Sequence, residues 1–200
     1  MTKLGSNTLI LTGTNGTTTT TITSGTLQIG NGTTSGALGS SDVSNGGTLT
    51  FNLPSGSVTV ANKITGAGGS LTQAGNSGSN LTLSGQNTYT GGTTVNSGTL
   101  TAGISTSGSS YGAFGIGSNI IVNGGTLALG AFNETVGTVR IDTNGGSITS
   151  TTGILTGTSY TLANTSPNTA SISAILAGSG VTLTQSGTGT STLSLSLIHI

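Results

Sequence analysis

The segment from residue 81 to residue 103, LTLSGQNTYTGGTTVNSGTLTAG, constrains the fold of this chain more than any other feature. It contains two short alternating apolar stretches, one around Leu83 and one from Val95 to Leu100, separated by a Gly, Asn and Thr corner at residues 85–92. An alternation of period two predicts β-strands that point one row of side chains inward and the other outward. We interpret the corner as too polar to belong to a core, and nothing around it has a helical period.

The same design recurs elsewhere in the chain. The longest internal match has no gap and aligns residues 58–84 with residues 170–196, keeping the apolar positions in phase. A second match relates the N-terminal region to the segment described above: Leu9 and Leu11 correspond to Leu81 and Leu83, and Gly25-Thr26-Leu27 corresponds to Gly98-Thr99-Leu100. Repetition over such distances predicts a repeat architecture.

Two arrangements of these strands are possible. Asn-Gly-Gly occurs before a strand at Asn45, Asn123 and Asn144, and Asn-Gly between strands favours an antiparallel sandwich or barrel. The fixed order of similar strands favours parallel coils, in which an Asn in one coil can pair with an Asn in the next. We predict an all-β fold, a right-handed parallel β-helix (β-solenoid), with about eight to ten coils of 20–25 residues each.

The composition excludes several kinds of partner. Gly, Ser and Thr make up more than half of the 200 residues, only 3% of the residues are charged, and the formal net charge is zero. Three Lys and Arg side chains cannot neutralise a phosphate backbone, so we expect no nucleic-acid partner. No apolar run approaches the roughly 20 residues of a membrane-spanning helix, so we expect no membrane insertion of this segment. The absence of Cys removes disulfides and thiol metal ligands.

Few side chains could perform chemistry near neutral pH, namely Lys3, Asp42, Lys63, Glu134, Arg140, Asp142 and His199. A Ser-His-Asp triad would need His199, which lies in the last residues of the chain. A glycosidase pair would need two carboxylates within about 5–10 Å, and the candidates are Glu134 and Asp142, with Arg140 between them. We interpret these three residues as a surface ion pair on one coil. We therefore predict no catalytic, cofactor-binding or metal-binding residue, and no enzyme.

The segment from Leu81 to Val95, followed by Gly98-Thr99-Leu100, resembles the autotransporter-associated β-strand repeat. That repeat occurs in passenger domains of autotransporters, the bacterial type V secretion proteins, and residues 180–196 resemble the lead-in to another copy. The resemblance implies a β-helix that is exported through the outer membrane and is exposed on, or released from, the cell surface. It implies a partner within the full-length protein, the outer-membrane barrel domain, and leaves any host or cell-surface ligand unidentified. It implies no catalytic residues. The first copy departs from the pattern at residues 16–20, where the NTYTGG corner is expected.

From these observations we expect a single repeat domain over residues 1–196, with repeat blocks near residues 8–30, 81–103 and 180–196. An off-pattern tail at residues 197–200 suggests a truncated reading frame. The expected function is a structural stalk segment of an adhesin-like passenger. A polysaccharide-active β-helix enzyme and a Thr-rich ice-binding solenoid are the alternatives.

Overall fold

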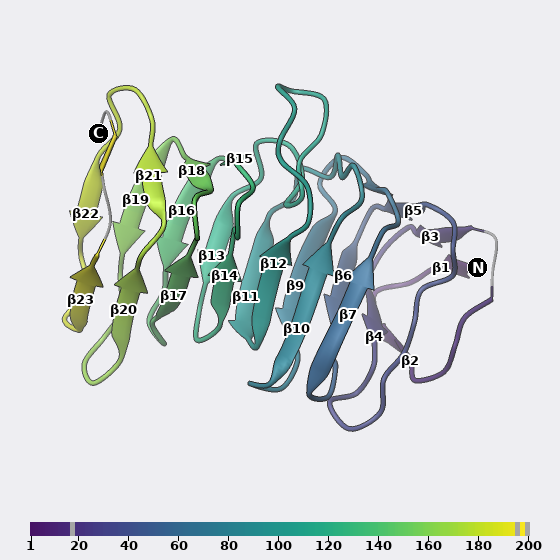
Figure 1. The fold of residues 1–200 in the computed structure, drawn as a ribbon. Helices are drawn as coiled ribbons and strands as arrows, with labels where there is room; N and C mark the ends of the chain where they lie inside the picture. Colours follow the sequence, from purple (N-terminus) through teal and green to yellow (C-terminus); the bar gives the residue numbers. More distant parts are fainter. Residues whose placement is uncertain (17–18, 195–196, 199–200) are drawn as a thin grey trace.

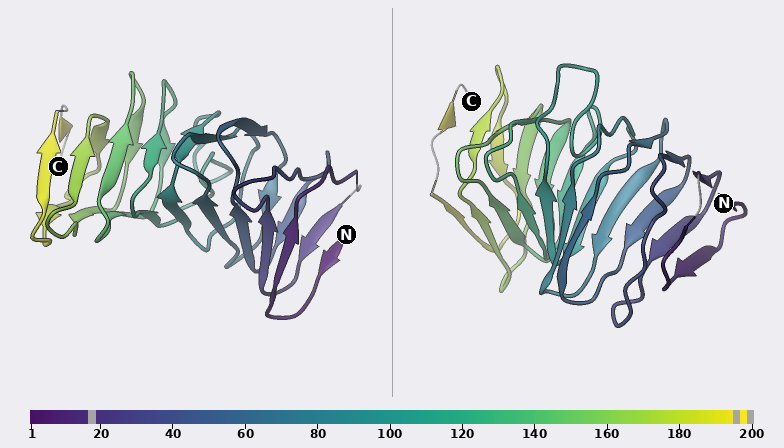
Figure 2. Two further views of the ribbon diagram at one scale, coloured as in Figure 1. Left: turned by 90° about the horizontal axis from the view of Figure 1, so that it is seen from below. Right: turned by 45° about the vertical axis from the view of Figure 1, so that its right-hand side comes forward.

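In the computed structural model, the chain winds into one parallel β-solenoid, as Figure 1 shows. The structure describes residues 1–16, 19–194 and 197–198. The longest sheet contains nine strands, one from each coil, so the number of coils lies within the predicted range. At about 4.8 Å per coil, the rod is about 40 Å long. Both views in Figure 2 place the termini at opposite ends of the rod. The part of the chain that the structure describes contains no helix able to cross a membrane.

Four sheets run along this rod. The long sheet has the order β2 (Thr8–Leu11), β4 (Thr26–Ile29), β6 (Thr48–Phe51), β9 (Ser70–Ala74), β11 (Thr93–Ser97), β13 (Ile120–Val122), β16 (Thr138–Ile141), β19 (Ser159–Leu162) and β22 (Leu183–Gln185). The seven-stranded sheet has the order β23 (Thr190–Leu193), β20 (Thr169–Ile172), β17 (Gly146–Thr149), β14 (Thr126–Ala128), β12 (Thr99–Ala102), β10 (Ser79–Leu83) and β7 (Gly56–Val60).

In most coils a third, short strand precedes the strand of the long sheet. These short strands form two sheets, one in the N-terminal coils and one in the C-terminal coils. The first short sheet contains β1 (Thr2–Lys3), β3 (Thr20–Ile22), β5 (Val43–Asn45) and β8 (Ile64–Thr65). The second short sheet contains β15 (Glu134–Thr135), β18 (Ile154–Thr156), β21 (Ile175–Ala177) and β24 (Leu197–Ile198). Between them, the fifth and sixth coils replace this strand with residues 85–92 and 103–119.

The core is built from rows of apolar side chains, one from each coil. Leu81 pairs with Leu100, which pairs with Leu127, and all three are completely buried. Leu83 is also buried, whereas Thr82 between them is only half-buried. The predicted alternation of inward and outward side chains is therefore confirmed, and the parallel β-solenoid is confirmed over the antiparallel alternative.

Each copy of the repeat folds as a coil that closes on its own first strand. In the first copy β2 pairs with β4, which places Leu9 beside Leu27, and in the second copy β10 pairs with β12, which places Leu81 beside Leu100. These are the positions that the sequence comparison equates. The two copies close on different faces of the rod. The first copy closes within the long sheet, and the second copy closes within the seven-stranded sheet.

The gapless internal match is also a match in structure. Strands β7, β9 and β10 lie in the same sheets as their counterparts β20, β22 and β23. At another corner the backbone N–H of Asn144 donates to Oδ1 of Asn123 at 3.1 Å, so the expected Asn pairing between neighbouring coils is confirmed there. Asn45 lies at a different corner, between the first short sheet and the long sheet.

The interpretation of residues 85–92 as lying outside the core holds for Gln86, Thr90 and Gly91, which are exposed, and is wrong for two other residues of the corner. Asn87 and Tyr89 are both completely buried. Oδ1 of Asn87 accepts a hydrogen bond from the N–H of Ile64 at 2.8 Å, and its Nδ2 donates to the carbonyl of Ala113 at 2.8 Å. The amide thus replaces the strand pairing that is missing from these coils, and a buried polar group whose hydrogen bonds are satisfied is compatible with a core.

Two residues of the expected off-pattern tail, Leu197 and Ile198, form β24 and pair with β21 in the preceding coil. Residues 199 and 200 lie outside the described residues. The domain boundaries that we expected, and the truncated reading frame, stay predictions.

We predict that Leu83→Asp lowers the free energy of unfolding by several kcal/mol, because it buries an unpaired charge in a completely apolar row. Thr82→Asp is the matched control on the outward row, and it should change the free energy by no more than about 0.5 kcal/mol. Urea denaturation followed by circular dichroism measures both values. Equal losses for the two variants would contradict the assigned orientation.

Candidate functional site

The most unusual chemistry in the described chain lies where the sixth coil leaves the regular path. Residues 103–119 form an excursion that connects β12 to β13, and in Figure 1 part of this teal segment rises above the neighbouring coils. The tip is exposed at residues 107–110, whereas residues 112–115 at its base are buried. The N–H of Ser107 donates to the carbonyl of Tyr111 at 2.9 Å and closes the tip.

Glu134 lies beneath this excursion, in an inward-facing row of the second short sheet. Its neighbours in that row are Leu155 and Leu176, both completely buried, and Glu134 itself is 1% exposed. Two residues later, Val136 is also buried. Sequence reasoning placed Glu134 on the surface, although its alternation with Val136 was a signal that it faces inward.

One carboxylate oxygen of Glu134 holds both sides of the excursion. Oε2 accepts hydrogen bonds from Oγ1 of Thr106 at 3.0 Å and from the N–H of Ala113 at 3.1 Å. The other oxygen, Oε1, is buried and has no hydrogen-bond partner among the described residues. Burial raises the pKa of Glu134 to about 7, against the opposing effect of the hydrogen bonds from Thr106, Ala113 and Phe114. The side chain can therefore change its charge near neutral pH.

Tyr89 and Thr93 extend the buried polar cluster into the preceding coil. The hydroxyl groups of Tyr89 and Thr93 lie 2.7 Å apart, and Thr93 also donates to the carbonyl of Phe114 at 3.3 Å. Burial raises the pKa of Tyr89, and the negative charge of Glu134 raises it further, so the phenol stays protonated. Tyr89 packs in the repeat corner and is completely buried.

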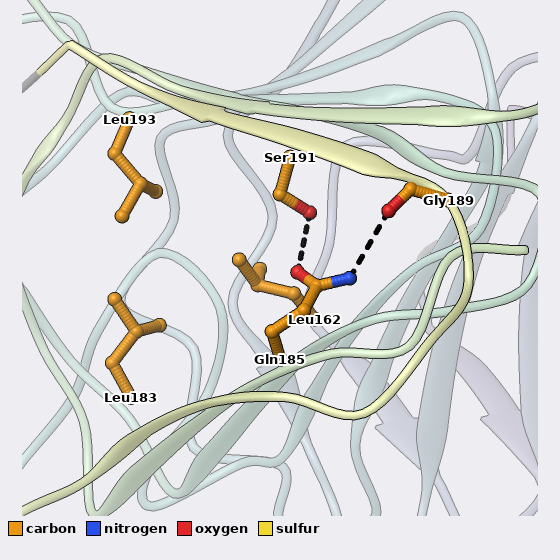
Figure 3. Close-up of a pocket in the computed structure, with 6 residues that line it drawn as sticks. All are labelled: Leu162, Leu183, Gln185, Gly189, Ser191 and Leu193. Atoms are coloured by element: carbon orange, nitrogen blue, oxygen red, sulfur yellow. Dashed lines mark hydrogen bonds between the residues drawn. The ribbon is translucent and has the colours of Figure 1, made fainter.

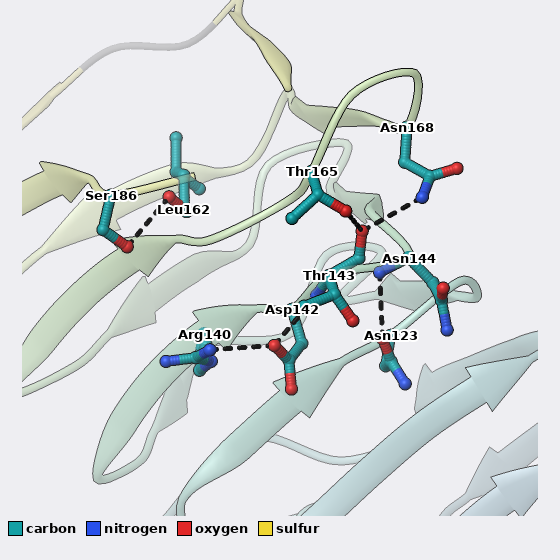
Figure 4. Close-up of polar contacts among 9 residues, drawn as sticks. All are labelled: Asn123, Arg140, Asp142, Thr143, Asn144, Leu162, Thr165, Asn168 and Ser186. Atoms are coloured by element: carbon teal, nitrogen blue, oxygen red, sulfur yellow. Dashed lines mark hydrogen bonds and ion pairs between the residues drawn. The ribbon is translucent and has the colours of Figure 1, made fainter. Parts of the chain in front are cut away.

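Asp142, the other carboxylate of the candidate pair, and Arg140 lie elsewhere on the rod. Arg140 Nη2 donates to Asp142 Oδ1 at 2.9 Å on the surface beside β16, as Figure 4 shows. The hydrogen bond from Arg140 lowers the pKa of the Asp142 carboxyl. The surface ion-pair interpretation is confirmed for Arg140 and Asp142 and wrong for Glu134, which belongs to the interior. An exposed pair of this kind contributes about 1 kcal/mol or less.

The other ionisable candidates have local structural contacts. The buried Nζ of Lys3 donates to the carbonyls of Leu4, Gly5 and Ser24 near the N-terminal end of the rod. The N–H of Lys63 donates to Oδ1 of Asp42, one coil away, at 3.3 Å. Within residues 1–16, 19–194 and 197–198, no group of three or more His, Cys, Asp or Glu residues could hold a metal ion.

His199, the base that a Ser-His-Asp triad would require, lies outside the described residues. Glu134 is enclosed beneath residues 112–115, so its carboxyl group does not present itself to a polymeric substrate on the surface. The structure does not bring Glu134 and Asp142 into one surface cleft. The carboxyl group of Glu134 holds the base of the excursion on the rod through hydrogen bonds. The strength of these hydrogen bonds depends on whether the carboxyl group is protonated.

Comparison with known families finds the repeat in two parts of the chain. Residues 1–29 and 71–102 match the family model of the passenger-associated-transport-repeat. The two matches contain the self-closing coils described above, and the resemblance of the second segment to an autotransporter passenger repeat is confirmed. No curated protein and no solved structure gave a significant match to the chain.

We predict that Glu134 makes the stability of the protein depend on pH. Its pKa is raised from 4.5 to about 7 in the folded state, so the folded protein holds this proton more tightly. The resulting stabilisation is fully present below pH 4.5 and is lost as the pH rises through about 7, and it amounts to roughly 3 kcal/mol. Glu134→Gln should be more stable than the wild type at pH 8 and should lose this dependence.

The measurement is urea denaturation of both proteins at intervals between pH 4 and pH 8.5. Asp142→Asn is the matched control, because its carboxyl group lies on the surface and its pKa is lowered. It should leave the loss of stability between pH 5 and pH 8 in place. An equal loss in the wild type and in Glu134→Gln would show that Glu134 is not the responsible group.

Proposed function

Because this chain carries two passenger-associated-transport repeats, the repeats of autotransporter passengers, we propose that it is a structural stalk segment of a surface-exposed or secreted passenger. The observation that carries this proposal is the agreement between sequence and fold. Each matched segment contains a coil that closes on its own first strand, and further coils of the same kind extend the rod. A rod of stacked coils separates whatever it presents from its point of attachment.

The adhesin-like role is supported by the excursion between β12 and β13. Its tip, residues 107–110, is exposed, and its base is fixed by Glu134, Thr106 and the backbone of Ala113. A loop on a rigid scaffold is the usual location of binding residues. In this proposal the rod displays the loop, and the partner that anchors the rod is the outer-membrane barrel domain of the full-length protein.

The structure favours neither alternative function. A polysaccharide-active site would need accessible carboxylates, and Glu134 is 1% exposed. An ice-binding face would need an uninterrupted array of Thr. The outward row of the long sheet continues from Thr72 and Thr94 to Ile121 and Arg140, and this change breaks the array.

Surface display can be tested in the source bacterium by inserting an epitope tag at Gly108, the exposed tip of the excursion. We expect an antibody to label intact cells and external protease to remove the signal, because the tagged loop faces the medium. A periplasmic protein with the same tag is the control, and it should become labelled only after the outer membrane is permeabilised. If the Gly108 tag behaved like this control, the passenger proposal would be contradicted.

A further inference from the structure

The C-terminal end of the rod carries an open hollow between β22 and β23. Its volume is about 370 Å³, and Figure 3 shows the side chains that enclose it. The lining residues are Leu162, Leu183, Gln185, Gly189, Ser191 and Leu193. Leu193 is 42% exposed, which is unusual for a residue in an inward row of this solenoid.

The equivalent position in the middle of the rod is covered by the next coil. The gapless internal match equates Leu183, Gln185, Ser191 and Leu193 with Leu71, Gln73, Ser79 and Leu81. In the middle of the rod these four residues are at most 1% exposed. The difference arises because β11 and β12 cover β9 and β10, placing Val95 beside Gln73 and Leu100 beside Leu81.

The two hollows share a polar contact at their floor. Nε2 of Gln73 donates to Oγ of Ser79 at 3.0 Å, and Oγ of Ser191 donates to Oε1 of Gln185 at 2.6 Å. In Figure 3 the Gln185 side chain turns toward Ser191 and also toward the carbonyl of Gly189, to which its Nε2 donates at 3.3 Å. The exposed hollow therefore has the same Gln–Ser contact as the covered one, with the Gln185 amide turned over so that its oxygen faces Ser191. Docking a segment there requires no rearrangement beyond a rotation of this amide.

The covered hollow shows which segment fits. Gly98 lies over the Gln73–Ser79 contact with φ +68°, and a Cβ at this position would lie 2.4 Å from Oγ of Ser79 and 2.9 Å from Nε2 of Gln73. A covering segment thus needs Gly at the bend between its two strands, a Val before the bend and a Leu after it. Residues 91–103, GGTTVNSGTLTAG, have this pattern.

We propose that the C-terminal end of the rod is a docking surface for one further coil of the repeat, an extended segment with the sequence pattern of residues 91–103. The Val seats against Gln185, the Leu seats against Leu193, and the Gly lies over the contact between Gln185 and Ser191. The backbone of the segment extends the long sheet and the seven-stranded sheet beyond β22 and β23. This inference rests on the internal repeat alone and is independent of surface display.

The first test is binding of a fluorescently labelled peptide, residues 91–103, to the full chain, measured by anisotropy. We expect saturable binding with one peptide per chain. The Gly98→Ala peptide is the matched control, and it should bind at least tenfold more weakly, because its Cβ meets the floor of the hollow. Equal binding of both peptides would overturn the proposal.

Variants of the chain locate the binding site. Leu193→Asp should weaken binding at least tenfold, whereas Leu9→Asp, at an exposed position on the opposite end of the rod, should leave it unchanged. The competing occupant is the N-terminal end of a second copy. Concentration-dependent self-association that is abolished by Leu9→Asp and competes with the peptide would identify that occupant and overturn the proposal.

A covalent graft keeps the proposal testable if the free peptide binds too weakly to detect. Ser196 corresponds to Ser84 in the internal match, so residues 85–103 can replace residues 197–200 without changing the register. We expect the graft to raise the thermal unfolding midpoint and to slow hydrogen exchange in β23. The same graft with the Gly98→Ala change should neither raise the thermal unfolding midpoint nor slow hydrogen exchange in β23. Absence of peptide binding together with no gain from the graft would refute the docking surface.

Discussion

The backbone pairing of each strand with its equivalent one coil later is the interaction on which the rest of this structure depends. The pairing stacks like positions about 4.8 Å apart along every sheet. Two like charges at that spacing repel by about 1 kcal/mol even in water, and by more inside the rod. Thr, Ser and Asn carry no charge and can form hydrogen bonds to one another, as Thr101 does to Asn80 at 2.7 Å. The low charge of the chain, 3% of its residues, is compatible with this stacking of like positions.

Several of the polar side chains in the interior of the described chain lie where the regular pairing stops or changes direction. Asn87 supplies hydrogen bonds where two coils lack a strand, and Gln73 spans the bend between the long sheet and the seven-stranded sheet. Glu134 fastens the base of the excursion and leaves one oxygen without a partner. An unsatisfied buried oxygen destabilises the charged form, which is why burial dominates the pKa of this carboxyl group.

The sequence predicted the parts of the fold that depend on period and repetition. Leu81, Leu83 and Leu100 face inward because the alternation and the internal matches leave them no other face. The corner at Asn87 was misjudged, because its burial depends on hydrogen bonds to Ile64 and Ala113 in other coils, and residue type alone cannot reveal such partners. Glu134 was misplaced because a carboxylate is usually exposed, although its alternation with Val136 indicated an inward position. Its row is occupied by Leu155 and Leu176, and this register follows from strand pairings that the local sequence does not contain.

The solenoid separates the residues that specify the fold from those that can carry function. Inward rows such as Leu81, Leu100 and Leu127 are fixed by packing, because any change in volume affects the coils on both sides. The outward rows consist largely of Thr, and in the long sheet this row changes to Ile121 and Arg140. Distinct chemical features arise where a coil departs from the repeat. In the described chain residues 103–119 are one such departure, and burial against this segment raises the pKa of Glu134, so the strength of its hydrogen bonds to Thr106 and Ala113 depends on pH.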